Sequence, residues 1–368
     1  MALKQTCLKV LLCASAFTCL LLLWCQLPRS ITELLSSSHK NGVRFNSLFS
    51  DDLQEPKCQI HQVLLVLVTT DPGHMKARRA IRRTWAAPAR DGAHPWQVVF
   101  LIGRTLDVEL DWHIHKEQAA HGDILMGNYL DSYRNLTLKV MHGMKWASER
   151  CRPRYILKTD DDCFVNTDRF PAFLAHHNKV QSGLYVGSVF PEKKRVVIRD
   201  PKSKWYVSRE HFQLDSYPPY ASGVGYVLSS DVVRKVLKMA EIITPIPVED
   251  AYIGLLARRA QIMPLSSSRF TKNNIKWGIC NYRYLMVIHR MAPGDQKLAQ
   301  KNVLRTLSSG CHLGITGSSV ESSSSVHHRT SNLCTYVLFP SQSTALGIGI
   351  WWSFIHCKCS VRIQVNTH

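Results

Sequence analysis

Acidic residues are scarce in this sequence: 27 Asp and Glu side chains stand against 46 Lys and Arg, a formal net charge of +19. Such a balance attracts phosphates, acidic glycans, anionic membranes or nucleic acid. The sequence nevertheless lacks zinc-finger spacing, an RNP-like aromatic box and a basic zipper, so nothing beyond charge favours nucleic acid. Cys357 and Cys359 also lack the partners that a zinc site requires. We therefore expect no nucleic-acid partner.

Apolar runs of membrane-spanning length are equally rare. Val10–Leu27 qualifies, at about 18 residues, the short end of the range for a bilayer span. Lys4 and Lys9 precede it and Arg29 follows, which by the positive-inside rule leaves the N-terminus cytosolic. No small-x-small cleavage site adjoins the run, so a retained anchor is favoured over a cleaved signal peptide. We expect a single-pass type II protein with residues 1–9 cytosolic, in the thin membranes of the early secretory pathway.

The composition after the anchor changes twice. Residues 28–57 are polar without a helical or strand period and are expected to form a stem. Residues 58–304 are long enough for a lumenal domain with a single core. Residues 305–368 are rich in Ser and poor in charge, and we expect a poorly ordered tail without a catalytic part. A lumenal location permits disulfides, but the twelve cysteines do not reveal their pairing.

Continuous apolar runs that end in turn residues predict buried strands. We expect four such strands, at residues 63–68, 98–103, 123–125 and 155–158. Helical patterns stand between them, at residues 76–85, 107–120 and 130–150. This alternation predicts an α/β sandwich with a largely parallel sheet. In such sheets ligands bind at the carboxyl ends of the strands.

Three consecutive aspartates, Asp160, Asp161 and Asp162, directly follow the last of these strands. Adjacent carboxylates repel one another, and a divalent cation relieves that repulsion. Hard oxygen ligands suit Mg²⁺ or Mn²⁺, which would also bind a diphosphate. A capping or turn cluster is the alternative for an isolated aspartate run, and the buried strand before it favours the metal site. A dehalogenase-like phosphatase is disfavoured because its motif would require Thr or Val at the position of Phe164.

The segment KTDDDCFVN resembles the metal motif of the β1,3-galactosyltransferase family, which includes β1,3-N-acetylglucosaminyltransferase relatives. Further segments resemble that family in the same order: RRAIRRTW, VVFLIG, HGDIL, DSYRNLTLK, KWYVS, YPPYASGVGYVLSSDV, VEDAYIG and VIH. The resemblance covers residues 63–292. It implies a GT-A-like, Rossmann-type sandwich behind a transmembrane helix. Ala221 stands where many members have Cys, which puts one family disulfide in doubt.

The resemblance also implies a metal site and a general base. Asp160 and Asp162 match the outer aspartates of the family's metal motif, and His289 matches a late histidine that completes the metal site in related enzymes. Asp162 corresponds to the direct metal ligand, and Asp160 to the aspartate that also faces the donor. Without the family, His289 would be interpreted as a core histidine. Asp250 matches the general base, and Glu249 beside it is the alternative for that role.

Donor binding has further candidates among basic and aromatic side chains. Arg78 and Arg82 lie four residues apart on one predicted helix face and are expected to meet the diphosphate or uracil end of the donor. Lys139, Asp161 and Trp205 are also assigned to the donor. The sequence supports two roles for Trp205 equally: stacking on a sugar face and packing in the core.

Two local motifs have both a structural and a functional interpretation. Asn135 heads the sequon Asn-Leu-Thr and is the predicted glycosylation site, although it lies inside a predicted helix. The glycines of the segment Ser222–Gly225 do not complete G-x-G-x-x-G. Close backbone approach is therefore favoured there over a phosphate-binding loop.

Together these roles predict an inverting, metal-dependent glycosyltransferase of the Golgi membrane. It would move galactose from UDP-galactose to the 3-hydroxyl of an acceptor glycan on a glycoprotein or glycolipid. Within the family, transfer of N-acetylglucosamine from UDP-GlcNAc is the alternative. From another class, the alternative is a non-catalytic, lumenal sugar-binding relative.

Overall fold

A computed structural model describes the chain over residues 42–49, 55–59, 62–87, 96–272 and 279–308. The predicted cytosolic tail and anchor, residues 1–27, lie outside this part of the chain, as does the predicted tail from residue 309 on. No helix within the described residues has both the length and the apolar character to cross a bilayer.

A large sheet with strand order β3-β2-β1-β4-β7-β6-β8 forms the centre of the domain. Its strands are β1 (Leu64–Thr69), β2 (Trp96–Arg104), β3 (Ile124–Leu130), β4 (Tyr155–Asp160), β6 (Tyr185–Val189), β7 (Ala221–Ser229) and β8 (Leu265–Ser266). Strands β1 to β4 pair in parallel, β7 is antiparallel to both β4 and β6, and β8 is parallel to β6. All strands of this sheet except β7 therefore run in one direction, which confirms the expected α/β fold with a largely parallel sheet.

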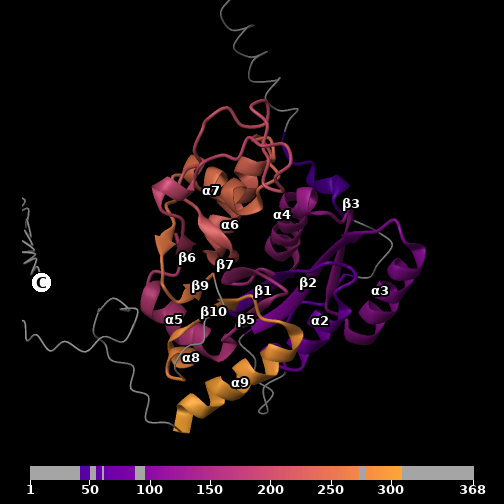
Figure 1. Ribbon diagram of the computed structural model, residues 1–368, viewed down its shortest axis with the longest axis vertical. Helices are drawn as coiled ribbons and strands as arrows, with labels where there is room; N and C mark the ends of the chain where they lie inside the picture. The colour runs from indigo at the N-terminus through magenta and orange to yellow at the C-terminus, as the bar shows by residue number, and fades with distance from the viewer. Residues whose placement is uncertain (1–41, 50–54, 60–61, 88–95, 273–278, 309–368) are drawn as a thin grey trace, which may run out of the picture. The chain divides into compact units, whose positions relative to one another are not determined.

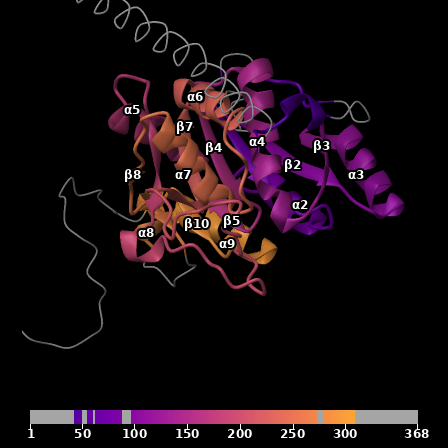
Figure 2. The same ribbon diagram turned by 90° about the horizontal axis from the view of Figure 1, so that it is seen from above.

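Helices cover both faces of this sheet (Figures 1 and 2). They are α2 (Met75–Arg82), α3 (Val108–His121), α4 (Leu136–Trp146), α5 (Phe170–His177), α6 (Ser230–Ala240), α7 (Glu249–Arg259), α8 (Asn281–Tyr284) and α9 (Pro293–Ser308). Leu65 and Leu67 of β1 pack with α4, α6 and α7, whereas Leu64 and Val66 pack with α2, α3, α5 and α9. Because both faces of β1 are buried, its sequence is apolar throughout.

A second, three-stranded sheet lies beside the end of β4. It consists of β5 (Cys163–Val165), β10 (Val287–His289) and β9 (Phe270–Thr271), in that order. Strand β10 is antiparallel to β5, in a register that puts His289 opposite Cys163. This pairing brings a histidine from the end of the domain next to the aspartate run.

The predicted helix over residues 130–150 begins too early, whereas helical structure extends to Cys151 at its other end. Strand β3 continues to Leu130, and the Asp131 amide then donates to the Arg104 carbonyl at the end of β2. A 3-10 helix over Tyr133–Asn135 precedes α4, and one π-helical turn, Ala147–Cys151, follows it. Pairing with β2 thus overrides the local helical pattern at residue 130.

Residues 42–49, assigned to the stem by their polar composition, pack onto the folded domain. Val43 donates its amide to the Ala240 carbonyl at the end of α6, and Asn128 of β3 donates to the Leu48 carbonyl. The side chains of Val43 and Leu48 are buried in the same core as α4 and α6. The domain therefore begins before residue 58, because a few well-placed apolar side chains outweigh the surrounding polar composition.

One disulfide joins Cys58 to Cys151, across 93 residues of sequence. It fastens the segment before β1 to the turn that follows α4. Cys163, directly after the aspartate run, is a free and buried thiol. The pairing could not be read from the spacing of the cysteines, because it depends on the fold.

Candidate active site

The aspartate run lies where β1 and β4 end together. These strands are parallel neighbours with Thr69 opposite Asp160, so both end at the same edge of the sheet. The Thr69 hydroxyl donates to Asp160 Oδ1 at 2.5 Å, and Lys158 Nζ donates to the same oxygen at 2.7 Å. Asp160 is therefore held in one orientation at the carboxyl end of the sheet, where ligands bind in this class of fold.

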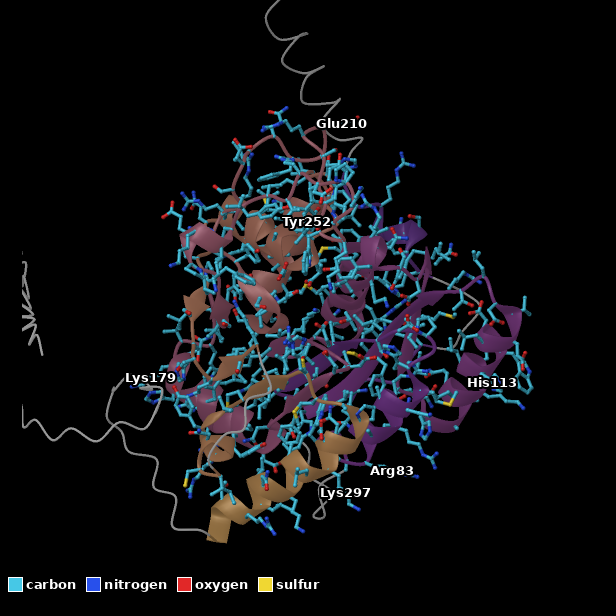
Figure 3. All side chains as sticks on the ribbon, viewed as in Figure 1. Arg83, His113, Lys179, Glu210, Tyr252 and Lys297 are labelled. Carbon is cyan, nitrogen blue, oxygen red and sulfur yellow. A yellow bond between two sulfur atoms is a disulfide. The ribbon has the colours of Figure 1, made fainter. Side chains whose placement is uncertain are left out.

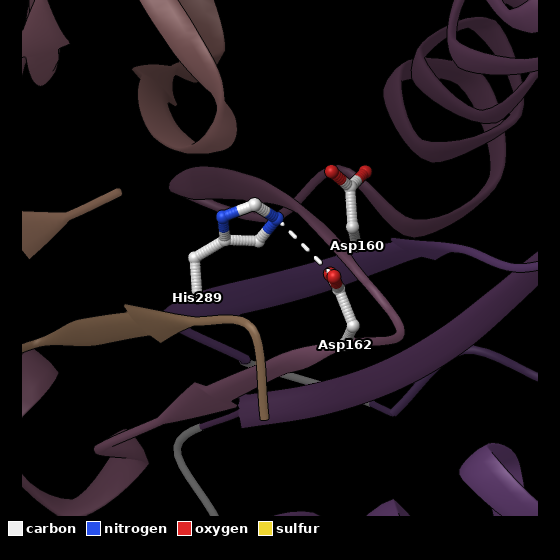
Figure 4. Close-up of side chains that lie close together, drawn as sticks. All are labelled: Asp160, Asp162 and His289. Atoms are coloured by element: carbon white, nitrogen blue, oxygen red, sulfur yellow. Dashed lines mark ion pairs between the residues drawn. The ribbon is translucent and has the colours of Figure 1, made fainter. Parts of the chain in front are cut away.

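His289 faces Asp162 across the register of β5 and β10 (Figure 4). His289 Nε2 lies 3.2 Å from Asp162 Oδ2, while Nδ1 lies 2.8 Å from the carbonyl oxygen of Lys272. Burial opposes protonation of His289, but the hydrogen bond and charge of Asp162 prevail and raise its pKa. With Nδ1–H donated to a carbonyl, Nε2 is the nitrogen that is oriented toward the aspartates.

Asp160, Asp162 and His289 form a group whose ligand atoms lie within 4.8 Å of one another. Two carboxylates and one imidazole are ligands that Mn²⁺ accepts, and Mg²⁺ accepts the oxygens. The carbonyl of Lys272 behind His289 supplies the outer partner that metal-binding histidines usually have. By donor chemistry and orientation, the residues present fit a divalent cation.

Asp161 does not belong to this group. Its Oδ2 accepts from the Thr70 hydroxyl at 2.6 Å and lies 2.9 Å from His74 Nδ1. These contacts tie the aspartate turn to the loop between β1 and α2. The three aspartates, adjacent in sequence, therefore point to different partners.

A second acidic pair lies at the start of α7. Glu249 is buried, accepts a hydrogen bond from the Tyr226 hydroxyl, and has Oε2 3.3 Å from Lys158 Nζ. Asp250 is only partly buried, and its Oδ2 accepts from the Gly223 amide at 2.9 Å. Burial raises the pKa of Asp250, although the Gly223 amide opposes the rise. Glu249 thus has its two oxygens engaged inside the protein, whereas Asp250 lies at the site surface.

Lys158, which was not among the site residues predicted from the sequence, connects the two acidic clusters. Its ammonium group, buried on β4, contacts Asp160, Glu249 and the Gly223 carbonyl, the last at 2.8 Å. Burial works against the charged form, yet the charges of Asp160 and Glu249 raise the pKa of Lys158. A signal was available, because a lysine in an apolar strand two residues before an aspartate points to the same face as that aspartate.

The two arginines predicted to meet the donor are used inside the protein. Arg78 is fully buried and donates to Glu117 and to the carbonyls of Asp71 and Pro72. Arg82 contacts Glu117 as well and donates to Asp123, in pairs that hold α2 beside α3. Direct contact of Arg78 with a donor does not fit this burial. Its role is to shape the loop between β1 and α2.

Lys139 is buried in a similar way. Its Nζ donates to Asp131 at 2.8 Å and to the Thr70 carbonyl at 2.8 Å. Burial lowers the pKa of Lys139, and the Asp131 charge opposes that shift. Lys139 therefore supports the loop after β1 from beneath, and its ammonium group does not face a ligand site.

Trp205 is half exposed, beside Lys204 and near Tyr133. Lys204 Nζ lies 4.6 Å from the centre of a Trp205 ring and 5.3 Å from that of Tyr133. Burial and the Asp250 charge raise the pKa of Tyr133 to about 12, so this aromatic pair lies close to the second acidic cluster. Such a pair offers a face on which a sugar ring can stack.

Asn135 ends the 3-10 helix and precedes α4, so it does not lie inside a regular helix as predicted. Its Nδ2 donates to the Leu130 carbonyl at 2.9 Å, and Thr137 of the sequon is buried with its hydroxyl on the Ile246 carbonyl. Both ends of the sequon thus have structural hydrogen bonds in the folded domain.

A cavity of about 700 Å³ adjoins the aspartate turn, within the size range of small-ligand sites. It is lined by Asp161 and Asp162 on one side, and by His74 and Lys76 at the start of α2 on another. Arg290 and the segment that leads into α9 complete the wall. Carboxylates and cations thus share one concave site.

Comparison with known proteins fits this arrangement. A family model described as galactosyltransferase matches residues 76–267. The chain is 33% identical over 247 residues to beta-1,3-galactosyltransferase 1 of Homo sapiens, which covers 66% of this chain and 75% of that protein. It belongs to the galactosyltransferase family. It is also 32% identical over 259 residues to beta-1,3-galactosyltransferase 5 of Gorilla gorilla gorilla, 69% of this chain and 85% of that protein.

Membership of the galactosyltransferase family makes the chain a glycosyltransferase, an enzyme that takes a nucleotide-sugar donor and a glycan acceptor. Among solved structures, the chain matches the WbbM bifunctional glycosyltransferase with a TM-score of 0.38 and 9% identity. That match covers 71% of this chain and 53% of the other.

Replacing Lys158 of this galactosyltransferase-family enzyme by Met should lower the free energy of unfolding by about 3–5 kcal/mol. The variant keeps the volume but leaves the buried carboxylate of Glu249 without its cation. Urea unfolding measures the change. The exposed Lys235→Met is the control, expected within about 0.5 kcal/mol of the wild type. Equal stability of both variants would show that Lys158 does not hold the acidic clusters.

Glu249 should make stability depend on pH in the direction opposite to most carboxylates. Burial raises its pKa from 4.5 to about 7, although Lys158 opposes this. Its stabilising contribution is complete below pH 4.5 and is lost as the pH rises through about 7, by up to about 3 kcal/mol. The measurement is urea unfolding of the wild type and Glu249→Gln at pH 5, 6 and 7.5. A wild-type-minus-variant difference that is constant over this range would contradict the assignment.

Proposed function

We propose that the enzyme transfers galactose from UDP-galactose to the 3-hydroxyl of an acceptor glycan, with inversion, to form a β1,3 linkage. The observation that carries this proposal is the joining of two acidic clusters, Asp160 with Asp162 and Glu249 with Asp250, through Lys158. The relatives are named as beta-1,3-galactosyltransferases, which supports both galactose and the linkage.

Asp162 and His289 would hold a divalent cation, Mn²⁺ or Mg²⁺, with Asp160 turned toward the donor. When bound, such a cation supplies positive charge against the diphosphate of the donor. The cavity beside Asp161 and Asp162 receives the nucleotide, where the ammonium group of Lys76 and the imidazole of His74 line the wall. The acidic groups of the site then have a counter-charge and the phosphates have partners.

Asp250 is the general base in this proposal. Its carboxylate takes the proton of the acceptor 3-hydroxyl, the oxygen forms a bond to the anomeric carbon, and the bond from that carbon to the diphosphate breaks. The electron pair leaves with UDP. A single displacement at an α-linked donor gives a β product. Partial exposure of Asp250 and full engagement of Glu249 favour Asp250 over its neighbour.

Around this reaction we place a GT-A-like domain that begins near residue 42 and extends through α9. The anchor at residues 10–27 would hold it on the Golgi membrane as a type II protein with the domain lumenal, and the stem reduces to the residues between. The apolar run and the lysines Lys4 and Lys9 before it support this orientation. A glycan on Asn135 remains part of the proposal.

Release of UDP from a panel of donors tests the proposal. The purified full chain is incubated with Mn²⁺ and UDP-galactose, UDP-GlcNAc or UDP-glucose, each with and without acceptor glycans. Acceptor-stimulated release from UDP-galactose is the expected result. Preference for UDP-GlcNAc would contradict the donor, and no release from any donor would make the chain a non-catalytic relative.

A further inference from the structure

A basic cavity of about 500 Å³ lies between α2 and α3, apart from the acidic clusters. Its cationic and titratable lining residues are Arg79, Arg82, Arg83, His113, Lys116 and His121. The acid in the lining, Glu117, is already neutralised by Arg78 and Arg82 at 2.7 and 2.5 Å. The remaining charge of this cavity is therefore positive.

Arg79 and Arg83 provide cations that are not used by the fold. Both are exposed and stand four residues apart on α2 and its C-terminal end. Neither side chain has a hydrogen bond or ion pair within the part of the chain that the structure describes. Across the cavity, Lys116 rests 3.5 Å from the ring centre of the exposed Trp112. Two guanidinium groups thus face a lysine beside an aromatic ring.

The same two arginines line a second cavity, of about 470 Å³, on the other side of α2. Its lining includes Lys76 and, from α9, Lys297. Figures 1 and 2 show α2 between α3 and α9, and Figure 3 labels Arg83, His113 and Lys297 at the surface of these three elements. We call the surface formed by Arg79, Arg83, Lys116 and Lys297 the α2 basic groove.

The α2 basic groove is continuous with the cavity beside the aspartate turn. Met75 lines both the cavity beside the aspartate turn and the cavity between α2 and α3. Lys76 and Pro293 line both the cavity beside the aspartate turn and the cavity next to α9. A molecule held near Asp162 can therefore extend over α2 without leaving a concave surface.

We propose that the α2 basic groove binds an acidic segment of a glycan, one whose sugars carry sulfate or carboxylate groups. This inference rests on the proposed function, because a glycan is expected at the adjoining site. Guanidinium groups bind sulfate and carboxylate in a bidentate manner, and Arg79 and Arg83 have these donors free for it. The indole of Trp112 adds an apolar face for a sugar ring.

Concavity favours a glycan over a membrane surface as the occupant. A flat anionic bilayer would contact protruding side chains, whereas these cations line two hollows on either side of one helix. The spacing of Arg79 and Arg83 by one helical turn, about 5–6 Å, suits successive charged groups on one chain. The groove thus selects for an acidic glycan in addition to the sugar that reacts.

The test uses the purified full chain and a size-defined, heparin-derived tetrasaccharide as the probe, at about physiological salt. Binding is measured by calorimetry for the wild type and for the double variant Arg79→Ser, Arg83→Ser. The control double variant, Lys179→Ser with Lys238→Ser, removes the same charge from exposed sites on α6 and after α5. Transfer to an uncharged acceptor is measured in parallel for all three proteins.

The groove variant should raise the Kd of the tetrasaccharide at least 10-fold, the control less than about two-fold, and both should keep wild-type transfer to the uncharged acceptor. Equal weakening in both variants would overturn the proposal in favour of diffuse charge. Absence of tetrasaccharide binding, with groove-dependent binding to phosphatidylserine vesicles instead, would overturn it in favour of a membrane. If the tetrasaccharide binds through the groove but no donor supports transfer, the proposed function is contradicted and the glycan-binding proposal is supported.

Discussion

Replacement of Asp250 by Asn is expected to lower kcat by about 1,000-fold, within the range that general base catalysis supplies. Asn preserves the size of the side chain and an oxygen that can accept from the Gly223 amide, so the first residues of β7 stay in place. It cannot take the proton of an acceptor hydroxyl. Burial raises the pKa of Asp250 toward the working pH, which suits it to that transfer in the wild type.

The loss should appear in kcat and leave donor binding almost unchanged. Calorimetry with UDP-galactose is expected to give a Kd within about two-fold of the wild type, because Asp250 meets the acceptor side. Asp215→Asn, at an exposed carboxylate, is the matched control and should retain full activity. A wild-type kcat in the Asp250→Asn enzyme would contradict the assignment of Asp250 as the general base and favour Glu249 for that role.

Asp162→Asn is expected to reduce transfer by about 100- to 1,000-fold, through loss of the cation that would stabilise the departing diphosphate. Replacing one carboxylate of the group formed with Asp160 and His289 removes a charged ligand. The Kd for Mn²⁺, measured by electron paramagnetic resonance with UDP present, should rise by at least about 10-fold.

The control for this effect is Asp168→Asn, an exposed aspartate six residues further along the chain. Raising Mn²⁺ should restore part of the activity of the Asp162 variant, because its affinity has fallen without loss of the fold. Unchanged Mn²⁺ affinity in the Asp162 variant would contradict the metal assignment, even if the activity fell.

The central strands were predictable because their surroundings are uniform. β1, β2 and β4 are covered on both faces, so β1 is apolar throughout and β2 and β4 each contain an apolar run. The start of the helix after β3 was predicted too early, since Leu130 still pairs with Arg104 of β2. Residues 42–49 escaped prediction because their burial depends on α4 and α6, which lie far away in the sequence.

The residues of the candidate site also differ in whether a local stretch of sequence predicts their position. The position of Asp160 at a strand end was readable from one local segment, and parallel pairing with Thr69 explains its orientation. The place of His289 depends on the pairing of β10 with β5, strands too short to leave a pattern, and only the family resemblance indicated it.

Charges on α2 were the least predictable part of the site. Arg78, Arg79, Arg82 and Arg83 lie within six residues, and the sequence does not separate them. In the structure Arg78 and Arg82 form ion pairs with Glu117, whereas Arg79 and Arg83 are exposed to solvent. Helical spacing alone assigned the first pair to a ligand, because the buried partner on α3 is invisible in a local pattern.

Dependence of transfer on the cation tests the central claim most directly. The purified full chain is treated with EDTA, then supplied with UDP-galactose and an acceptor glycan, with and without added Mn²⁺, and the product linkage is determined by NMR. We expect no product in EDTA, and a β1,3-linked galactose once Mn²⁺ is restored. Transfer that persists undiminished in EDTA would contradict a metal site at Asp160, Asp162 and His289.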